Sequence, residues 1–110
     1  MDARLTAGLR VAALLRRMDL TGRGAYVVHR GDDTAGALAV TVARPGGTVE
    51  LWVQDYDPLA DRRSWLCETA GAPRDIDATL ARRRARDPDL WVIEIESRDG
   101  RTLLDEAGLA

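Results

Sequence analysis

The chain has 110 residues, enough for one hydrophobic core and too few for two, so we expect one domain over residues 1–110. All 16 basic residues are arginine, and the net charge is −2. The absence of lysine excludes Schiff-base chemistry and a phosphate-binding loop of the lysine type. One cysteine and one histidine exclude a disulfide framework or a zinc site built within the chain.

No apolar stretch approaches the roughly 18 residues of a membrane span, and the N-terminal segment lacks the apolar core of a signal peptide. The single thiol, Cys67, fits a reducing compartment. We therefore predict a cytoplasmic protein with no membrane partner and no cofactor.

The first half of the chain predicts a helix followed by short strands. Apolar residues recur at helical spacing over residues 3–18, with Leu5, Leu9 and Ala12 placed on the same broad stripe as Val11 and Met18. Turn residues then separate four β-prone runs. These runs are residues 25–30, 37–43, 48–54 and, more weakly, 63–68, with a loop predicted over 55–62.

A second helix is predicted from residue 74 or 75 to about residue 87, where Pro88 ends it. Alternating apolar residues over 90–96 give the strongest strand signal in the chain, and residues 101–106 fit a short strand or a helical turn. The predicted fold is therefore α+β, in the order α-β-β-β-β-α-β. We expect an antiparallel sheet of four to five strands with two amphipathic helices on one face.

Several short motifs carry a family resemblance. They are Arg30-Gly31-Asp32, Ala35-Gly36, the Ile76-Asp77 and Leu80 start of an arginine-rich helix, the run Asp87-Pro88-Asp89-Leu90-Trp91 with the acidic strand after it, and Gly100-Arg101. With these motifs the chain resembles domain of unknown function 1491, a family of short alphaproteobacterial proteins, over about residues 4–106. The resemblance implies the limits of the domain, and it implies no activity, cofactor or catalytic residue.

Three carboxylates are candidate metal ligands. Glu94 and Glu96 share one face of the last predicted strand, and Glu50 lies on another candidate strand. Together they could hold Mg²⁺ or Mn²⁺ for phosphoester chemistry, or they mark the solvated face of a half-buried sheet. The element order is also similar to that of restriction-endonuclease-like nucleases, but Trp52 stands where such a nuclease needs its lysine. A metal-dependent phosphoesterase or nuclease remains an alternative function.

The arginine-rich second helix suggests nucleic acid as another alternative partner. Arg82 and Arg86 would share a helix face, and Arg10 and Arg17 of the first helix would add to it. The net charge of the second helix is small, so we rank a protein partner above DNA or RNA. A nucleophilic pair of Cys67 and His29 would need the two side chains in contact, and no motif surrounds either residue.

The main functional hypothesis is a non-enzymatic binding or assembly module. Leu38, Val40 and Val42 are grouped with Val49, Leu51 and Val53 on a face that the helices would cover. The other face would be an open contact surface made of Trp52, Ala37, Ala39, Thr41 and Val92. We expect a homo-oligomer, in the simplest case a homodimer, or another protein partner at this face, with a sheet edge as the variant.

Overall fold

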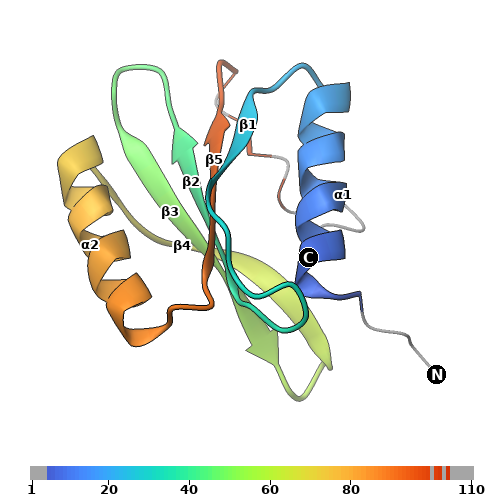
Figure 1. The fold of residues 1–110 in the computed structure, drawn as a ribbon. Helices are drawn as coiled ribbons and strands as arrows, with labels where there is room; N and C mark the ends of the chain where they lie inside the picture. The colour runs from blue at the N-terminus through green and yellow to red at the C-terminus, as the bar shows by residue number, and fades with distance from the viewer. Residues whose placement is uncertain (1–4, 100, 103, 105–110) are drawn as a thin grey trace.

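Two helices and five strands follow one another in the predicted order, so the α+β class and the element order are confirmed. This computed structural model describes residues 5–99, 101–102 and 104, without the side chains of Asp55 and Tyr56. The elements are α1 (Ala7–Leu20), β1 (Ala25–His29), β2 (Leu38–Ala43), β3 (Val49–Asp57), β4 (Arg62–Gly71), α2 (Pro73–Arg86) and β5 (Trp91–Glu96) (Figure 1). The element expected over residues 101–106 lies partly outside the described residues.

The five strands form one sheet in the order β1-β5-β2-β3-β4. β5 lies between β1 and β2, antiparallel to β1 and parallel to β2. The β2–β3 and β3–β4 pairs are antiparallel. The sheet is therefore mostly antiparallel, with one parallel pair, and β1 and β4 are its two edges.

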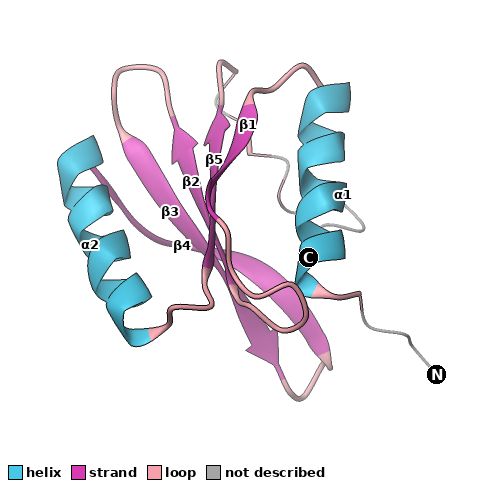
Figure 2. Ribbon diagram, in the orientation of Figure 1, coloured by secondary structure: helices cyan, strands magenta, loops and turns pink. Residues whose placement is uncertain are grey.

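The helices cover opposite faces of the sheet (Figure 2), so the expectation that both lie on one face is wrong. α1 packs on a core that includes Val40 and Ile93, whereas α2 packs on one that includes Leu51 and Val92. Neighbouring residues of β5 are thus buried on both sides, as expected of a central strand between two layers. Neither described helix is long and apolar enough to cross a membrane.

Local chemistry explains where the helices begin and end. The Thr6 side chain accepts a hydrogen bond from the Leu9 N–H at 3.4 Å and caps α1, while Gly22 follows its end with φ +75°. Pro73 occupies the first turn of α2, where a missing N–H does no harm. The predicted apolar stripe is corrected: Leu5 lies before α1, and Leu5, Leu9 and Ala12 are all exposed.

The β3–β4 hairpin is longer than predicted. The loop expected over residues 55–62 shrinks to a short turn because β3 continues to Asp57 and β4 starts at Arg62. Asp61 adopts φ +48° in this turn, a conformation that Asp tolerates better than most residues. The strand pairing continues to Asp57 and Arg62, so polar residues that were expected in the loop lie in regular strands.

Candidate functional site

Three of the motifs that carry the family resemblance, Arg30-Gly31-Asp32, Ala35-Gly36 and the run over residues 87–91, meet where the β1–β2 loop crosses the start of β5. The backbone of this loop approaches β5 so closely that a Cβ on Gly31 or Gly36 would overlap the carbonyl oxygen of Asp89. The Asp32 N–H donates to that carbonyl at 3.0 Å, and the Trp91 indole N–H donates to the Asp32 carbonyl at 2.7 Å. The glycines are thus required by a close backbone contact.

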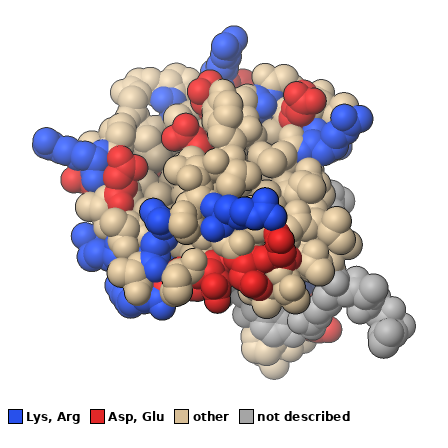
Figure 3. Space-filling view, viewed as in Figure 1, with Lys and Arg blue, Asp and Glu red and all other residues tan. Residues whose placement is uncertain are grey.

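The same loop also holds the start of α1. The N–H groups of Ala7 and Gly8 donate to the carbonyls of Thr34 and Asp33, at 3.1 and 2.9 Å. The Arg30 guanidinium lies 5.4 Å from the centre of the Trp91 ring, within the range of a cation–π interaction. Figure 3 shows acidic side chains gathered at the lower centre of this view, in the region of this loop. The residues of these three motifs therefore join the β1–β2 loop to the start of β5, and the same loop holds the start of α1.

The residues of the predicted open face are divided between the two sides of the sheet. Trp52 lies opposite Val40 in the register and packs against the α1 core, and its indole N–H donates to Glu50 at 3.0 Å. Ala39 and Val92 are buried in the core beneath α2. The proposed grouping fails because the hairpin register sets Trp52 on the α1 side, away from these residues.

The two remaining members of that grouping, Ala37 and Thr41, do not restore an open face. Thr41 is only 6% exposed, and Ala37 precedes β2, where its carbonyl accepts the Trp91 N–H at 2.8 Å. The predicted contact surface is therefore not present as one surface.

The three candidate metal ligands are also divided. Glu50 lies on the α1 side beside Trp52 and forms an ion pair with Arg44 at 3.2 Å. Glu94 and Glu96 alternate with the α1-core residues of β5, so they lie on the α2 side. Within the described part of the chain, no group of three metal-ligating side chains comes together.

The arginines predicted for nucleic acid do not form one patch. Arg82 and Arg86 belong to α2, which lies at the left of Figure 3, and Arg10 and Arg17 belong to α1 on the opposite side of the sheet. The sheet thus separates the two pairs of guanidinium groups.

His29 and Cys67 cannot act together either. His29 ends β1 at one edge of the sheet, and Cys67 lies on β4 at the other edge, with three strands between them. Burial and the Glu50 carboxylate raise the pKa of the Cys67 thiol, which lowers its thiolate fraction.

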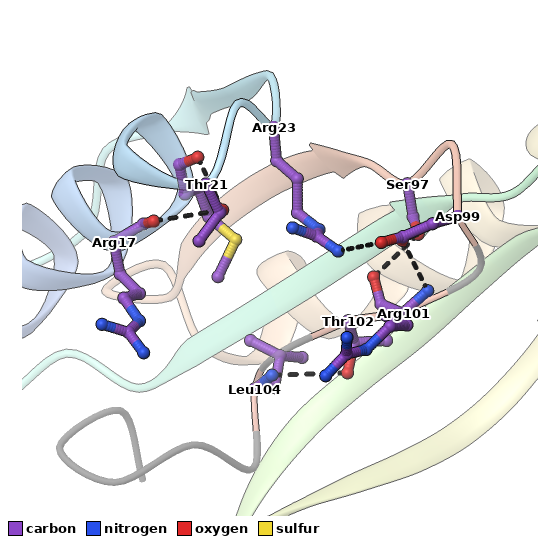
Figure 4. A network of polar contacts seen from close by, with 9 residues as sticks. Arg17, Thr21, Arg23, Ser97, Asp99, Arg101, Thr102 and Leu104 are labelled. Atoms are coloured by element: carbon purple, nitrogen blue, oxygen red, sulfur yellow. Dashed lines mark hydrogen bonds and ion pairs between the residues drawn. The ribbon is translucent and has the colours of Figure 1, made fainter.

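A polar network links the segment after α1 to the segment after β5 (Figure 4). Arg23, whose side chain is 11% exposed, donates to Asp99 at 2.6 Å, and Asp99 also accepts the Arg101 N–H at 3.0 Å. This N–H and the Arg23 guanidinium lower the pKa of Asp99. The Ser97 hydroxyl donates to the Arg101 carbonyl at 2.7 Å.

An open depression of about 150 Å³ adjoins this network, lined by residues 21–24 together with Glu96, Arg98 and Asp99. Two acidic and two basic side chains line it, and Arg23, whose side chain is 11% exposed, is already paired with Asp99. The depression therefore has no net preference for a charged ligand, and the network serves to fix the turn after β5 to the start of β1.

The largest unexplained surface is the edge strand β1. Its three central residues are all exposed, Tyr26 by 51%, Val27 by 41% and Val28 by 62%. Consecutive exposed residues mean that neither face of this strand is fully covered, although each residue is apolar or aromatic. Sequence reasoning placed a strand here but missed its edge position, because nothing local indicates that β5 separates β1 from β2. The available signal was the uninterrupted run Tyr26-Val27-Val28 with no charge in it.

Comparison with known proteins identifies relatives over nearly the whole chain. The model of the DUF1491 family, described as a protein of unknown function, matches residues 5–105. A crystal structure of a DUF1491 family protein from Caulobacter crescentus CB15 is 40% identical, covers 89% of this chain and 92% of its own, and superimposes with a TM-score of 0.81.

Two solution structures agree with this match. An NMR structure of a DUF1491 family protein from Caulobacter crescentus CB15 is 37% identical over 91% of this chain and 92% of its own, with a TM-score of 0.78. Protein Atu0922 from A. tumefaciens is 33% identical over 88% of this chain and 89% of its own, with a TM-score of 0.76. No curated protein matches the chain.

Proposed function

Because the chain belongs to the DUF1491 family, whose function is unknown, the family supplies no activity, and we propose from the surface of β1 that the protein is a non-enzymatic assembly module that forms a homodimer by edge-to-edge strand pairing. The observation that carries the proposal is the exposure of Tyr26, Val27 and Val28 on an edge strand. An edge strand presents unpaired backbone N–H and C=O groups, which a strand of another chain can pair with.

The two edges of the sheet differ in their protection against such pairing. β4 carries the charged residues Arg62, Arg63 and Glu68, and its register with β3 shifts next to Trp52. Charges and bulges are the usual devices that keep an edge strand from pairing. β1 has no charge and no proline among its five residues. Its register with β5 also shifts once, between Val27 and His29, so charge and not a bulge distinguishes the two edges. β1 is therefore the edge that supports pairing.

A twofold axis through Val27 gives the register that matches exposed side chains best. In an antiparallel pair around this axis, Tyr26 lies opposite the partner's Val28, the residue at which the register of β1 with β5 shifts. Val27 lies opposite the partner's Val27 on the α1 side. Aromatic pairs with β-branched residues contribute about 0.2–1 kcal/mol each in a sheet. The axis repeats the Tyr–Val pair twice, so the strand is self-complementary.

The expected dimer is weak. A five-residue edge gives an interface below the roughly 1,200 Å² that stable protein pairs bury. We expect a dissociation constant on the order of 100 µM. The dimer would therefore form only where the protein is concentrated.

Sedimentation velocity at protein concentrations from about 10 µM to about 1 mM tests this proposal. The reducing agent in the buffer keeps the exposed Cys67 from forming disulfide-linked dimers. Val27→Lys and Val27→Glu each place like charges on the axis, so each variant alone should stay monomeric. An equimolar mixture should form a heterodimer because the opposite charges then meet. Leu66→Lys, at an exposed apolar position on β4, is the matched control and should dimerise normally.

Two outcomes would refute the proposal. A wild-type protein that stays near 12.0 kDa at the highest concentration does not self-associate. Folded Val27 variants that dimerise as well as the wild type would exclude β1 as the contact. If the Val27→Lys and Val27→Glu variants are monomeric and their mixture also stays monomeric, β1 remains the contact strand. The register with the twofold axis at Val27 is then excluded.

We also propose a reducing compartment, the cytoplasm, as the location. Cys67 is a lone exposed thiol on an edge strand, and such a thiol is readily oxidised in an oxidising compartment. Fractionation of source cells with an antibody against the protein would test this, and recovery from the periplasm would refute it.

A further inference from the structure

Three polar side chains come together on the α1 side of the β3–β4 hairpin. Gln54 lies opposite Trp65 in the register, and Arg63 precedes Trp65 by two residues. The side chains of Gln54, Arg63 and Trp65 therefore point to the same side of the sheet. Trp65 and Trp52 pack against the core beneath α1, which identifies that side. Arg10 contributes from the helix itself.

The position of Arg10 on α1 directs it toward the hairpin. It lies three residues after the buried Ala7 and four before the buried Leu14, hence on the flank of the buried side. It is also close enough to Arg63 for the two charges to interact. The guanidinium groups therefore approach each other from the helix and from β4.

Two donors of this cluster lack acceptors. Arg10 Nη2 and Gln54 Nε2 are buried and have no hydrogen-bond partner. Buried polar groups are nearly always paired, so two unpaired donors on the α1 side of the sheet indicate a missing acceptor. Among the residues that the structure describes, neither Arg10 nor Arg63 forms an ion pair with an acid.

The electrostatics of the cluster point the same way. Burial and, to a smaller extent, the charge of Arg63 lower the pKa of Arg10. Two like charges held together in a partly buried place destabilise the protein unless an anion joins them. Arg10, Arg63 and Gln54 are each partly exposed as whole residues, so the buried donor atoms Arg10 Nη2 and Gln54 Nε2 lie close to the surface.

We propose that Arg10, Arg63 and Gln54 bind the phosphate group of a small molecule. Two guanidinium groups balance a dianion, and a phosphate group carries a charge of about −1.5 to −2 near neutral pH, whereas a carboxylate carries −1. The planar fork of each guanidinium donates two parallel hydrogen bonds to such a group, and the amide adds a third donor. The site is next to β4, at the opposite edge from β1, so it does not depend on the proposed dimer.

The test is a titration of the protein with inorganic phosphate at constant ionic strength, followed by NMR of the arginine Nε–H and glutamine side-chain NH₂ signals. The signals of Arg10, Arg63 and Gln54 should shift and saturate. Acetate at the same concentration should produce smaller shifts, because it is a monoanion. Arg63→Gln should weaken phosphate binding by roughly tenfold or more, the expected loss for a hydrogen bond to a charged group.

Arg16→Gln and Arg62→Gln are matched controls, since both arginines are exposed on the same two elements. Each should bind phosphate like the wild type. Arg10→Gln is the second variant, used if Arg63→Gln does not fold. Shifts that grow linearly without saturation, or equal losses in the controls and in Arg63→Gln, would overturn the site. Acetate binding as tight as phosphate would overturn the assignment to a phosphate group.

Discussion

Replacing Gly31 by alanine places a methyl group where the β1–β2 loop meets the start of β5. The added Cβ would overlap the Asp89 carbonyl oxygen and lie 2.6 Å from Cδ1 and 2.7 Å from the backbone N of Trp91. Two of these three atoms belong to the backbone, so no side-chain rotation can relieve the clash. The loop must move away from β5.

The loss of stability follows from the contacts that this movement breaks. The hydrogen bonds from Asp32 N–H to Asp89 and from the Trp91 indole to Asp32 contribute about 0.5–1.5 kcal/mol each. Overpacking adds about 1–3 kcal/mol. We expect Gly31→Ala to lower the free energy of unfolding by about 4 kcal/mol, which moves a urea midpoint by about 3 M for a domain of this size.

Urea unfolding followed by tryptophan fluorescence measures this change, and Trp91 reports directly on the loop. Gly71→Ala is the matched control, because nothing lies within 4 Å of its added Cβ and its φ is not positive. That control should stay within about 0.5 kcal/mol of the wild type. Equal midpoints for the two variants would refute the close contact between the loop and β5.

Three further outcomes are expected. Trp52→Ala should lower the free energy of unfolding by about 3 kcal/mol in urea denaturation, because the indole packs against the α1 core and donates to Glu50; unchanged stability with lost self-association would place Trp52 in an interface instead. Asp99→Asn should lower the melting temperature at neutral pH, because the lowered pKa of Asp99 means that its carboxylate stabilises the folded state above the ordinary value of 3.8. This difference should fade as the pH falls through the lower pKa of the folded state, and calorimetry that finds it constant into acid would contradict the ion pair with Arg23. Cys67 should react with iodoacetamide more slowly than free cysteine at about pH 8, since its pKa is raised, and Glu50→Gln should speed the reaction; equal rates in the two proteins would rule out the influence of Glu50.

The sequence predicts the elements well because their signals are local. Helical spacing located α1, and strict alternation located β5, where Ile93 and Ile95 are fully buried. Alternation shows which residues of one strand share a face, but it does not relate one strand to the next. The register across the β2–β3 turn decides that relation, and it places Trp52 beside Val40. The predicted contact face was wrong for this reason.

The candidate site depended on strand order, which the sequence does not indicate. Glu50 and Glu94 both look like solvated strand carboxylates, yet they lie on opposite sides of the sheet. The exposure of Tyr26 on β1 and the approach of Arg10 to Arg63 both result from contacts between residues far apart in the chain. No pattern within one element could have predicted either feature.

The insertion of β5 between β1 and β2 also constrains how the chain can fold as the ribosome makes it. β5 follows the other four strands in the chain, yet it supplies the centre of the sheet and pairs with both β1 and β2. While β5 is still in the exit tunnel, β1 has no neighbour to pair with, and the hairpins β2–β3–β4 expose the edge that β5 will fill. We therefore expect the nascent chain to stay incompletely folded until β5 has left the exit tunnel, with its apolar β1 open to chaperones throughout that interval.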